Sequence, residues 1–169
     1  MNSPASPYTI RRGTIGDAAA MARIFNHYVA TSDVIFSDTH LSAGDMAARL
    51  APIAGKFPFM VAEGDDGEVI GYCYAHLWQP DPVYRFTWEL TEYLDNRCCG
   101  RGVGTALLSA VISQCRQGGA HSLISCVTAT NEPCINMLIR LGFERVGCVA
   151  QSGYKFGRWH DDVFLQLML

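Results

Sequence analysis

Apolar residues recur along this chain at two spacings, and each change of spacing marks a new element. Tyr8 to Arg12 alternates as a strand does. A helix then begins at a capping-box pattern, Thr14 with Asp17 three residues later, and its apolar spacing continues to about residue 30. Residues 31–39 follow as a loop, and Ser42 opens a second, weaker helix. The start of the chain is therefore predicted as one strand and two helices.

From residue 58 the apolar spacing becomes that of strands. Phe59 to Ala62 and Val69 to Trp78 flank a short turn at residues 65–67, which is typical of a β-hairpin. The segment 79–82 breaks the pattern, and Val83 to Leu94 follows as a third strand-like stretch. Its shared apolar face is predicted to hold Phe86, Trp88, Leu90 and Glu92.

The second half alternates helices and strands. A glycine-rich turn at residues 100–104 leads into an amphipathic helix that ends at Gly118 and Gly119. The remaining predicted elements are a strand from His121 to Val127, a short helix capped by Asn131 and stopped by Gly142, and two strands at Phe143 to Ala150 and Val163 to Leu169. This order predicts one mixed α/β domain over residues 8–169, with residues 1–7 as a short flexible leader.

Composition and charge narrow the class of protein. With 169 residues, 49% of them hydrophobic, the chain is long enough to close one hydrophobic core. The net charge of −3 and the absence of a basic stripe argue against nucleic acid as a partner, and no apolar run is long enough to span a membrane. The seven cysteines form no CxxC pair, which favours reduced thiols in a cytoplasmic protein over a zinc site.

The turn Gly100-Arg101-Gly102-Val103-Gly104 is the first candidate for chemistry. A helix that follows a glycine-rich turn presents free backbone N–H groups and a partial positive charge, which suit a pyrophosphate. A tight turn with nothing bound fits the same pattern. A Walker loop is excluded because Thr105 and Ala106 follow where Lys and Ser or Thr are needed, and a dinucleotide fold would place the motif after the first strand.

The same turn, read on to Leu108, resembles the acetyl-coenzyme A loop of the GNAT N-acetyltransferase superfamily. The helix from Asn131 to Leu141, with the Gly-Phe-Glu that follows it, resembles the second signature of that superfamily. The segments 24–28, 84–89 and 153–161 are similar to the phosphinothricin-type members, so that the resemblance covers nearly the whole chain.

This resemblance implies a fold, a co-substrate and an assembly. The fold would be a mixed sheet of six to seven strands with about four helices, splayed between the fourth and fifth strands. Acetyl-CoA would be the co-substrate, without a metal, and its pantetheine would lie in the splay. The protein would be a homodimer. The coenzyme contacts would come from Glu92, Tyr93, Leu94, Gly100, Arg101, Gly102, Val103, Gly104, Thr105 and Asn131.

Two positions depart from the superfamily pattern. Cys99 stands where the coenzyme loop usually begins with Arg or Gln, so one cationic or hydrogen-bonding side chain is missing there. Leu138 stands where many members have Tyr, and this subfamily often His. A side-chain proton donor to the leaving thiolate is therefore absent at that position.

Acetyl transfer to an amine also needs a base, because most amines are protonated at neutral pH. The resemblance implies Glu89 for this role, and its apolar neighbours Trp88 and Leu90 favour a raised pKa. An outward carboxylate paired with an arginine is the alternative interpretation, and Glu92 is a weaker candidate for the base.

Three further residues are predicted to bind substrate. By strand parity Arg85 lies on the same side as Glu89, where its guanidinium would grip the carboxylate of an amino-acid-like substrate. Phe36 resembles the substrate-side aromatic of the family, although it also suits the core, and Lys155 would approach the same pocket, from this chain or a partner subunit.

The sequence hypothesis is thus a cytoplasmic N-acetyltransferase for a small amino-acid-like amine, such as phosphinothricin or methionine sulfone or sulfoximine. Two alternatives stay open. One is an acetyltransferase that acts on a protein N-terminus. The other is a non-catalytic acyl-CoA-binding module, which the departures at Cys99 and Leu138 make plausible.

Overall fold

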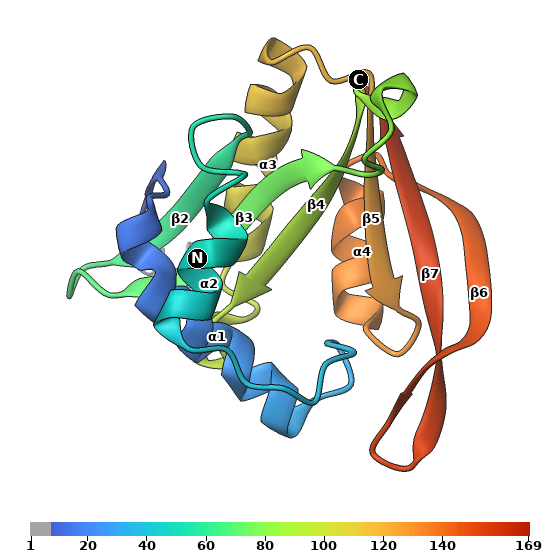
Figure 1. Ribbon diagram of the computed structural model, residues 1–169, viewed down its shortest axis with the longest axis horizontal. Coiled ribbons are helices and arrows are strands. Elements are labelled where there is room, and N and C mark those ends of the chain that lie inside the picture. Colours follow the sequence, from blue (N-terminus) through green and yellow to red (C-terminus); the bar gives the residue numbers. More distant parts are fainter. Residues whose placement is uncertain (1–7) are drawn as a thin grey trace, which may run out of the picture.

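The computed structural model describes residues 8–169, and the predicted leader at 1–7 lies outside the described residues. Seven strands form a single sheet in the order β1-β2-β3-β4-β5-β7-β6 (Figure 1). The strands are β1 (Tyr8–Arg12), β2 (Phe59–Gly64), β3 (Val69–Leu77), β4 (Thr87–Leu94), β5 (Ser122–Thr128), β6 (Glu144–Lys155) and β7 (Arg158–Met168). The helices are α1 (Ala18–Thr31), α2 (Ala43–Leu50), α3 (Val103–Gln117) and α4 (Glu132–Arg140).

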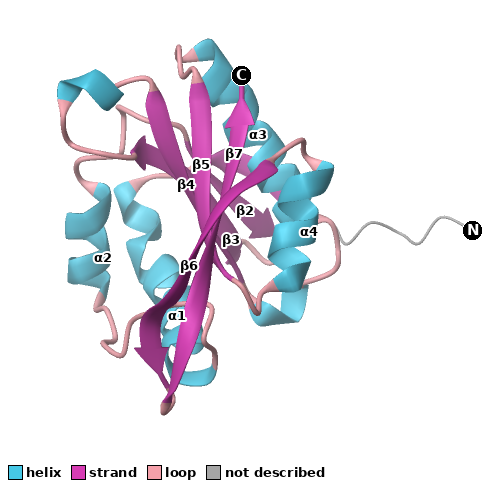
Figure 2. Ribbon diagram, turned by 90° about the vertical axis from the view of Figure 1, so that its right-hand side faces the viewer, coloured by secondary structure: helices cyan, strands magenta, loops and turns pink. Residues whose placement is uncertain are grey.

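Helices cover both faces of the sheet. Figure 2 shows α1 and α2 on one side and α3 and α4 on the other. Each pair of helices buries its own apolar cluster against the strands, with Phe25 and Tyr72 in the α1–α2 cluster and Leu107 and Leu123 in the α3–α4 cluster. No helix within residues 8–169 is both long and apolar enough to cross a membrane.

The sheet opens between β4 and β5. These two strands run parallel and pair only from Thr87 with Ser122 to Glu89 with Ile124. Beyond that point β4 continues beside β3 alone, while β5 continues beside β7 alone (Figure 1). The mixed seven-stranded sheet, the four helices and the splay between the fourth and fifth strands are therefore confirmed.

Two predicted element boundaries are wrong. The strand expected from Val83 begins only at Thr87, because Pro82–Tyr84 forms a 3-10 turn in which the Val83 N–H donates to the Asp81 carboxylate. Consequently Phe86 does not join the buried face of Trp88 and Leu90 and is 49% exposed.

The segment 153–160, expected as a connection, is instead the tip of the β6–β7 hairpin. Lys155 pairs with Arg158 across a two-residue turn. Phe156 and Gly157 in that turn have φ values of 52° and 76°, the left-handed conformation that matches the twist of a hairpin. Sequence alternation missed this because Phe is a rare residue at such a position.

Candidate active site

The loop before α3 gathers backbone N–H groups at the open end of the β4–β5 gap. Gly100 and Gly102 have φ values of 75° and 81°, a conformation that side chains disfavour, and Gly102 is the N-cap of α3. The helical ladder starts with the Ala106 N–H, which donates to the Gly102 carbonyl at 3.0 Å. The N–H groups of the first turn are thus available to an anion such as a diphosphate.

Gly104 in that first turn is needed for packing. A Cβ atom there would lie 3.1 Å from Leu94 Cδ1 of β4 and 3.2 Å from Met137 Sδ of α4. The missing side chain therefore lets α3 approach β4 and α4 closely at the mouth of the gap. This close approach places the N-terminus of α3 beside the unpaired part of β4.

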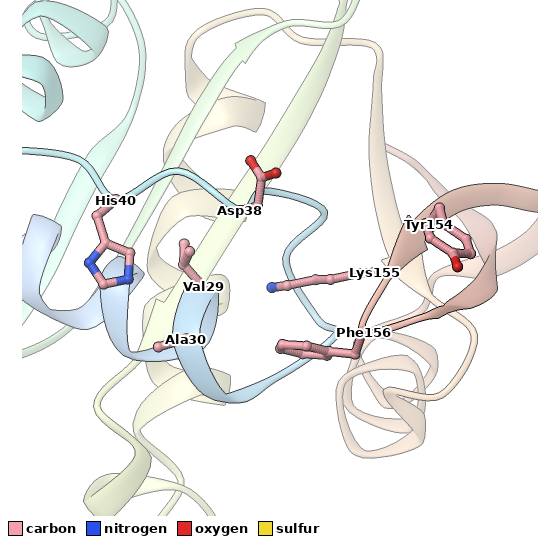
Figure 3. A pocket seen from close by; sticks show the side chains of 7 residues that line it. All are labelled: Val29, Ala30, Asp38, His40, Tyr154, Lys155 and Phe156. Carbon is pink, nitrogen blue, oxygen red and sulfur yellow. The ribbon is translucent and has the colours of Figure 1, made fainter.

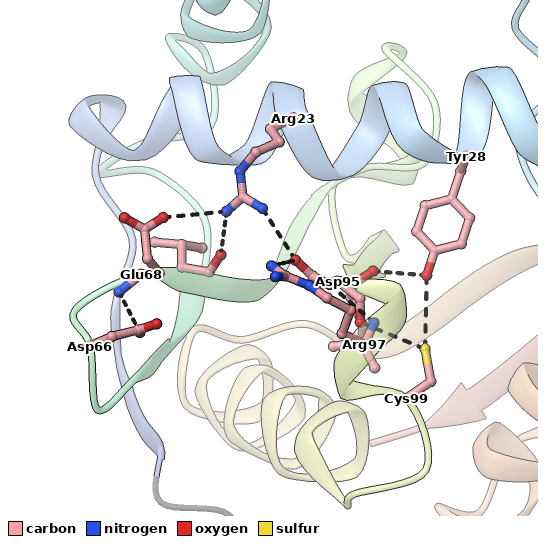
Figure 4. A network of polar contacts seen from close by, with 9 residues as sticks. Arg23, Tyr28, Asp66, Glu68, Asp95, Arg97 and Cys99 are labelled. Carbon is pink, nitrogen blue, oxygen red and sulfur yellow. Dashed lines mark hydrogen bonds and ion pairs between the residues drawn. The ribbon is translucent and has the colours of Figure 1, made fainter.

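Asp95 anchors the chain between β4 and the glycine loop (Figure 4). It is buried and accepts hydrogen bonds from Arg97 Nε at 2.9 Å and Nη2 at 2.7 Å and from Arg23 Nη1 at 3.2 Å. These guanidinium contacts hold the pKa of the Asp95 carboxyl well below its usual range. The Tyr28 hydroxyl, whose pKa is raised by burial, donates to the Leu94 carbonyl at 2.8 Å and lies 3.8 Å from Cys99 Sγ. Contacts from α1 therefore fix the direction in which the chain leaves β4 towards the glycine loop.

Glu89 lies on β4 at the last residue pair before the strands separate. It is half-buried, and among residues 8–169 no side chain forms an ion pair or hydrogen bond with its carboxylate. Burial raises the pKa of the Glu89 carboxyl, and the charge of nearby His76 acts in the opposite direction. A carboxylate whose pKa is raised by burial is a stronger proton acceptor than a fully solvated one.

The three following coenzyme candidates on β4 point to alternate faces. The Tyr93 ring packs on the α1 side, 5.8 Å from the Phe25 ring and 5.6 Å from the Tyr72 ring. Glu92 points to the α3 side, where its Oε1 atom is fully enclosed without a hydrogen-bond partner in the described part of the chain. The edge of β4 that faces β5 has no partner strand from Leu90 onward. Backbone groups on that edge are available to a ligand in the gap.

Arg85 lies outside β4, directly after the 3-10 turn. Its guanidinium donates to the Pro82 carbonyl at 3.2 Å and stacks over the Phe86 ring at 4.4 Å. The parity argument that placed it on the same side as Glu89 is therefore wrong, because a strand does not connect the two residues. The substrate role of Arg85 remains a prediction that rests on its proximity in sequence to β4.

Phe36 belongs to the loop between α1 and α2 and contacts the β6–β7 hairpin. Its ring lies 2.6 Å from the position of a Cβ on Gly153 and its centroid is 5.6 Å from that of the His160 ring. It is 38% exposed, so part of the ring remains open to a ligand. Its role in substrate binding remains a prediction.

Lys155 points across to the end of α1 (Figure 3). Its ammonium donates to the carbonyls of Ser32 and Ile35, both at 2.7 Å, and of Tyr28 at 3.4 Å. Burial lowers the pKa of this ammonium. Because these three carbonyls match the three ammonium hydrogens, the contacts indicate a structural role in joining α1 to the hairpin. Contact with substrate stays a prediction.

Asn131 is the N-cap of α4, and its side-chain oxygen accepts from the Cys134 N–H at 3.4 Å. Leu138 on the same helix is fully buried, consistent with a packing residue rather than a proton donor. Within residues 8–169 no group of three or more His, Cys, Asp or Glu side chains is arranged to hold a metal ion. The candidate site therefore consists of the open β4 edge, the α3 N-terminus and Glu89.

Sequence reasoning missed two residues that shape this site. His76 stands directly opposite Glu89 in the β3–β4 ladder, and Tyr28 reaches from α1 to the end of β4. Tyr28 lies in the segment 24–28 that carries the family resemblance, but neither contact could be read from it, because strand register and the approach of a distant helix are not encoded in a short window. Alternation along both predicted strands could have placed His76 on one of two faces, but not beside a particular residue.

Comparison with known proteins agrees with this geometry. Residues 10–164 match the family model described as Acetyltransferase (GNAT) domain. An L-methionine sulfoximine/L-methionine sulfone acetyltransferase of Pseudomonas paraeruginosa is 33% identical over 95% of this chain and 94% of its own. A GNAT superfamily phosphinothricin acetyltransferase of Sinorhizobium meliloti, solved in complex with AcCoA, superposes with a TM-score of 0.92 at 32% identity and covers 96% of this chain and 88% of its own.

A further solved structure carries a different activity in its name. It is a ribosomal-protein-alanine N-acetyltransferase of Brucella melitensis, with a TM-score of 0.90, 33% identity, and coverage of 95% of this chain and 99% of its own. The three relatives thus share acetyl transfer and differ in the amine that they are named for.

Proposed function

The chain belongs to the GNAT family of acetyl-CoA-dependent N-acetyltransferases, and from this premise we propose that it acetylates the primary amine of a small amino-acid-like substrate with Glu89 as general base. The observation that carries the proposal is the position of Glu89. It is a half-buried carboxylate without a side-chain partner among residues 8–169, at the point where β4 and β5 separate. Both the coenzyme gap and the carboxylate are therefore reached from the same opening.

Each part of the opening has a task in this reaction. Acetyl-CoA, the co-substrate, supplies the thioester. The first turn of α3 binds its diphosphate through backbone N–H groups, and the unpaired edge of β4 after Glu89 binds the pantetheine amides. Glu89 removes a proton from the substrate ammonium, and the free amine attacks the thioester carbonyl directly. Because Leu138 has no proton to donate, the leaving thiolate takes its proton from solvent.

The substrate class rests on the named relatives and on Arg85. Methionine sulfoximine, methionine sulfone and phosphinothricin each carry an amine next to a carboxylate, and Arg85 with Phe36 would hold such a molecule beside Glu89. A guanidinium binds a carboxylate in bidentate fashion, which fixes the direction of the amine. The likeness to the ribosomal-protein-alanine enzyme favours a second candidate, the N-terminal amine of a protein.

We further propose a cytoplasmic homodimer. All seven cysteines are unpaired within the described residues, which fits a reducing compartment. Large apolar side chains of the β6–β7 hairpin are exposed, among them Tyr154, Phe156 and Trp159 at 62%, 58% and 59%. A patch of this kind is typical of a protein–protein contact. Sedimentation at equilibrium would give twice the chain mass, and Trp159→Glu would reduce it to the mass of one chain.

A panel of amines with acetyl-CoA, followed by thiol release, tests the activity. We expect transfer to methionine sulfone or phosphinothricin, whereas transfer only to an alanine-initiated peptide would support the second candidate. Glu89→Gln should lower kcat/KM at neutral pH by roughly 10²-fold or more, the usual contribution of a general base. Glu144→Gln, at an exposed site on β6, is the matched control. Full activity of Glu89→Gln would refute the assignment of the base.

The role of Arg85 has its own test. Arg85→Ala should raise the KM for an amino acid by about tenfold or more, the size expected for a lost charge-assisted contact, and leave the KM for its carboxamide unchanged. An equal effect on both substrates would mean that Arg85 does not bind the carboxylate.

A further inference from the structure

His76 lies directly opposite Glu89 across the β3–β4 ladder. Cross-strand partners project from the same face of a sheet with Cβ atoms about 4.5–5.5 Å apart, so the imidazole and the carboxylate share one environment. His76 is half-buried, as Glu89 is, so part of its surface reaches solvent. The proposed reaction does not use this imidazole.

The contacts of the ring fix which nitrogen can act. Nδ1 of His76 lies 2.9 Å from the carbonyl oxygen of Leu77. A carbonyl can only accept, so Nδ1 carries the hydrogen of the neutral ring and Nε2 carries the lone pair. The Tyr74 ring, 6.0 Å away between centroids, packs against the imidazole. The backbone contact thus holds the imidazole through Nδ1, and the basic nitrogen Nε2 takes no part in it.

Other titratable groups also lie around Glu89 on the neighbouring strands. Tyr74 of β3 and Cys126 of β5 lie near enough to interact with its charge, and burial raises the pKa of both groups, to about 12 for Cys126. Asp162 of β7 contacts Cys126 rather than Glu89. Of these neighbours, His76 is the one whose side chain can carry a positive charge opposite Glu89.

We propose that His76 is a positioning residue for Glu89, and that it relays to solvent the proton that Glu89 removes from the substrate ammonium. This inference rests on the proposed function. The ammonium loses one proton to the Glu89 carboxylate, which becomes a neutral carboxyl. That proton passes through one water to Nε2 of the neutral His76, which restores the carboxylate and forms an imidazolium. The imidazolium releases the proton to bulk water, and no electrons change hands.

The pairing of His76 with Glu89 predicts a measurable change in the pKa of Glu89. A charged imidazole favours the ionised form of Glu89, so its removal should raise the pKa of that carboxyl. For a partly exposed pair we expect the pKa of Glu89 to rise by about 0.5 unit when the imidazole is removed. At pH values below this pKa the ionised fraction of Glu89 then falls about threefold. His76→Gln keeps a polar side chain of similar reach and removes the imidazole. His121→Gln, at an exposed position, is the matched control.

Two measurements test the proposal. The first is the acid limb of the pH profile of kcat/KM for the amine, which should move up by about 0.5 unit in His76→Gln and stay in place in His121→Gln. The second is the ¹³C NMR titration of the Glu89 side-chain carboxyl in the unliganded protein, assigned by its loss in Glu89→Gln. It should move by the same amount.

The outcomes separate the two proposals. An unchanged Glu89 titration in His76→Gln overturns the pairing, whatever the activity. A shifted titration with an unchanged acid limb means that the profile does not report Glu89, which overturns Glu89 as the base and the relay with it. If wild-type protein transfers no acetyl group to any amine while the Glu89 titration shifts as expected, the pairing stands and the proposed function fails.

Discussion

Glu92 provides the sharpest test of how burial acts in this fold. Its Oε1 atom is enclosed and has no hydrogen-bond partner within residues 8–169, although the residue keeps some exposed surface elsewhere. It stands opposite Cys73 in the ladder and 3.4 Å from the position of a Cβ on Gly104. Burial raises the pKa of the Glu92 carboxyl well above its ordinary value, and among residues 8–169 no cation opposes the rise.

The sign of the pH dependence follows from this direction. The folded state holds the proton more tightly than the unfolded state does, so the contribution of Glu92 to stability is complete below the unfolded pKa. It is lost as the pH rises through the folded pKa. The slope in that window is at most about 1.4 kcal/mol per pH unit for one group. Glu89 contributes in the same direction, so a variant is needed to isolate Glu92.

Two substitutions separate the charge from the unpaired oxygen. Glu92→Leu removes both, and because an unsatisfied buried polar atom costs about 1–3 kcal/mol, we expect the free energy of unfolding at pH 8 to rise by that amount. For a domain of this size this is an increase in Tm of about 2–12 °C. Glu92→Gln removes the titration and keeps a polar atom, so it should flatten the pH dependence with a smaller gain.

Urea unfolding at pH 5, 6.5 and 8 measures both effects. The gain of Glu92→Leu over wild type should be larger at pH 8 than at pH 5. The reasoning is refuted if Glu92→Leu is less stable than wild type at pH 8. It is also refuted if the slope of stability against pH is the same in wild type and in Glu92→Gln.

Three other substitutions test the loop, the hairpin contact and the Lys155 cap. Gly102→Ala should raise the KM for acetyl-CoA several-fold at unchanged kcat. Gly55→Ala is the control, because Gly55 has a similar φ of 80° with open space around it, and this variant should leave the KM for acetyl-CoA unchanged. Gly153→Ala displaces the Phe36 ring and should raise the KM for the amine but not for acetyl-CoA; equal KM values would remove Phe36 from the substrate site. Lys155→Met leaves three carbonyls without their donor and should lower the free energy of unfolding by about 2–4 kcal/mol, measured by thermal unfolding. A stability equal to that of wild type would contradict the structural role of Lys155.

The elements of this protein and the location of its proposed coenzyme loop follow from local sequence. Strand alternation, the capping box at Thr14 and the glycine turn at 100–104 act over a few residues, and the capping box and the turn were found where they were predicted. Errors arose where a local rule had an exception, as with the hairpin tip at Phe156 and the 3-10 turn before β4. The acid–base candidate Glu89 came from resemblance, since no local rule distinguishes a base from a surface carboxylate.

Contacts between distant segments were decided only in the folded chain. The facing of His76 and Glu89 depends on the register of β3 against β4, and the use of Lys155 as a cap depends on the hairpin that brings it to the end of α1. The enclosure of Glu92 depends on how closely α3 approaches β4 and α4. Local backbone preferences set the elements, but the surroundings of each ionisable group, and hence its protonation, are set by what packs against it from elsewhere in the chain.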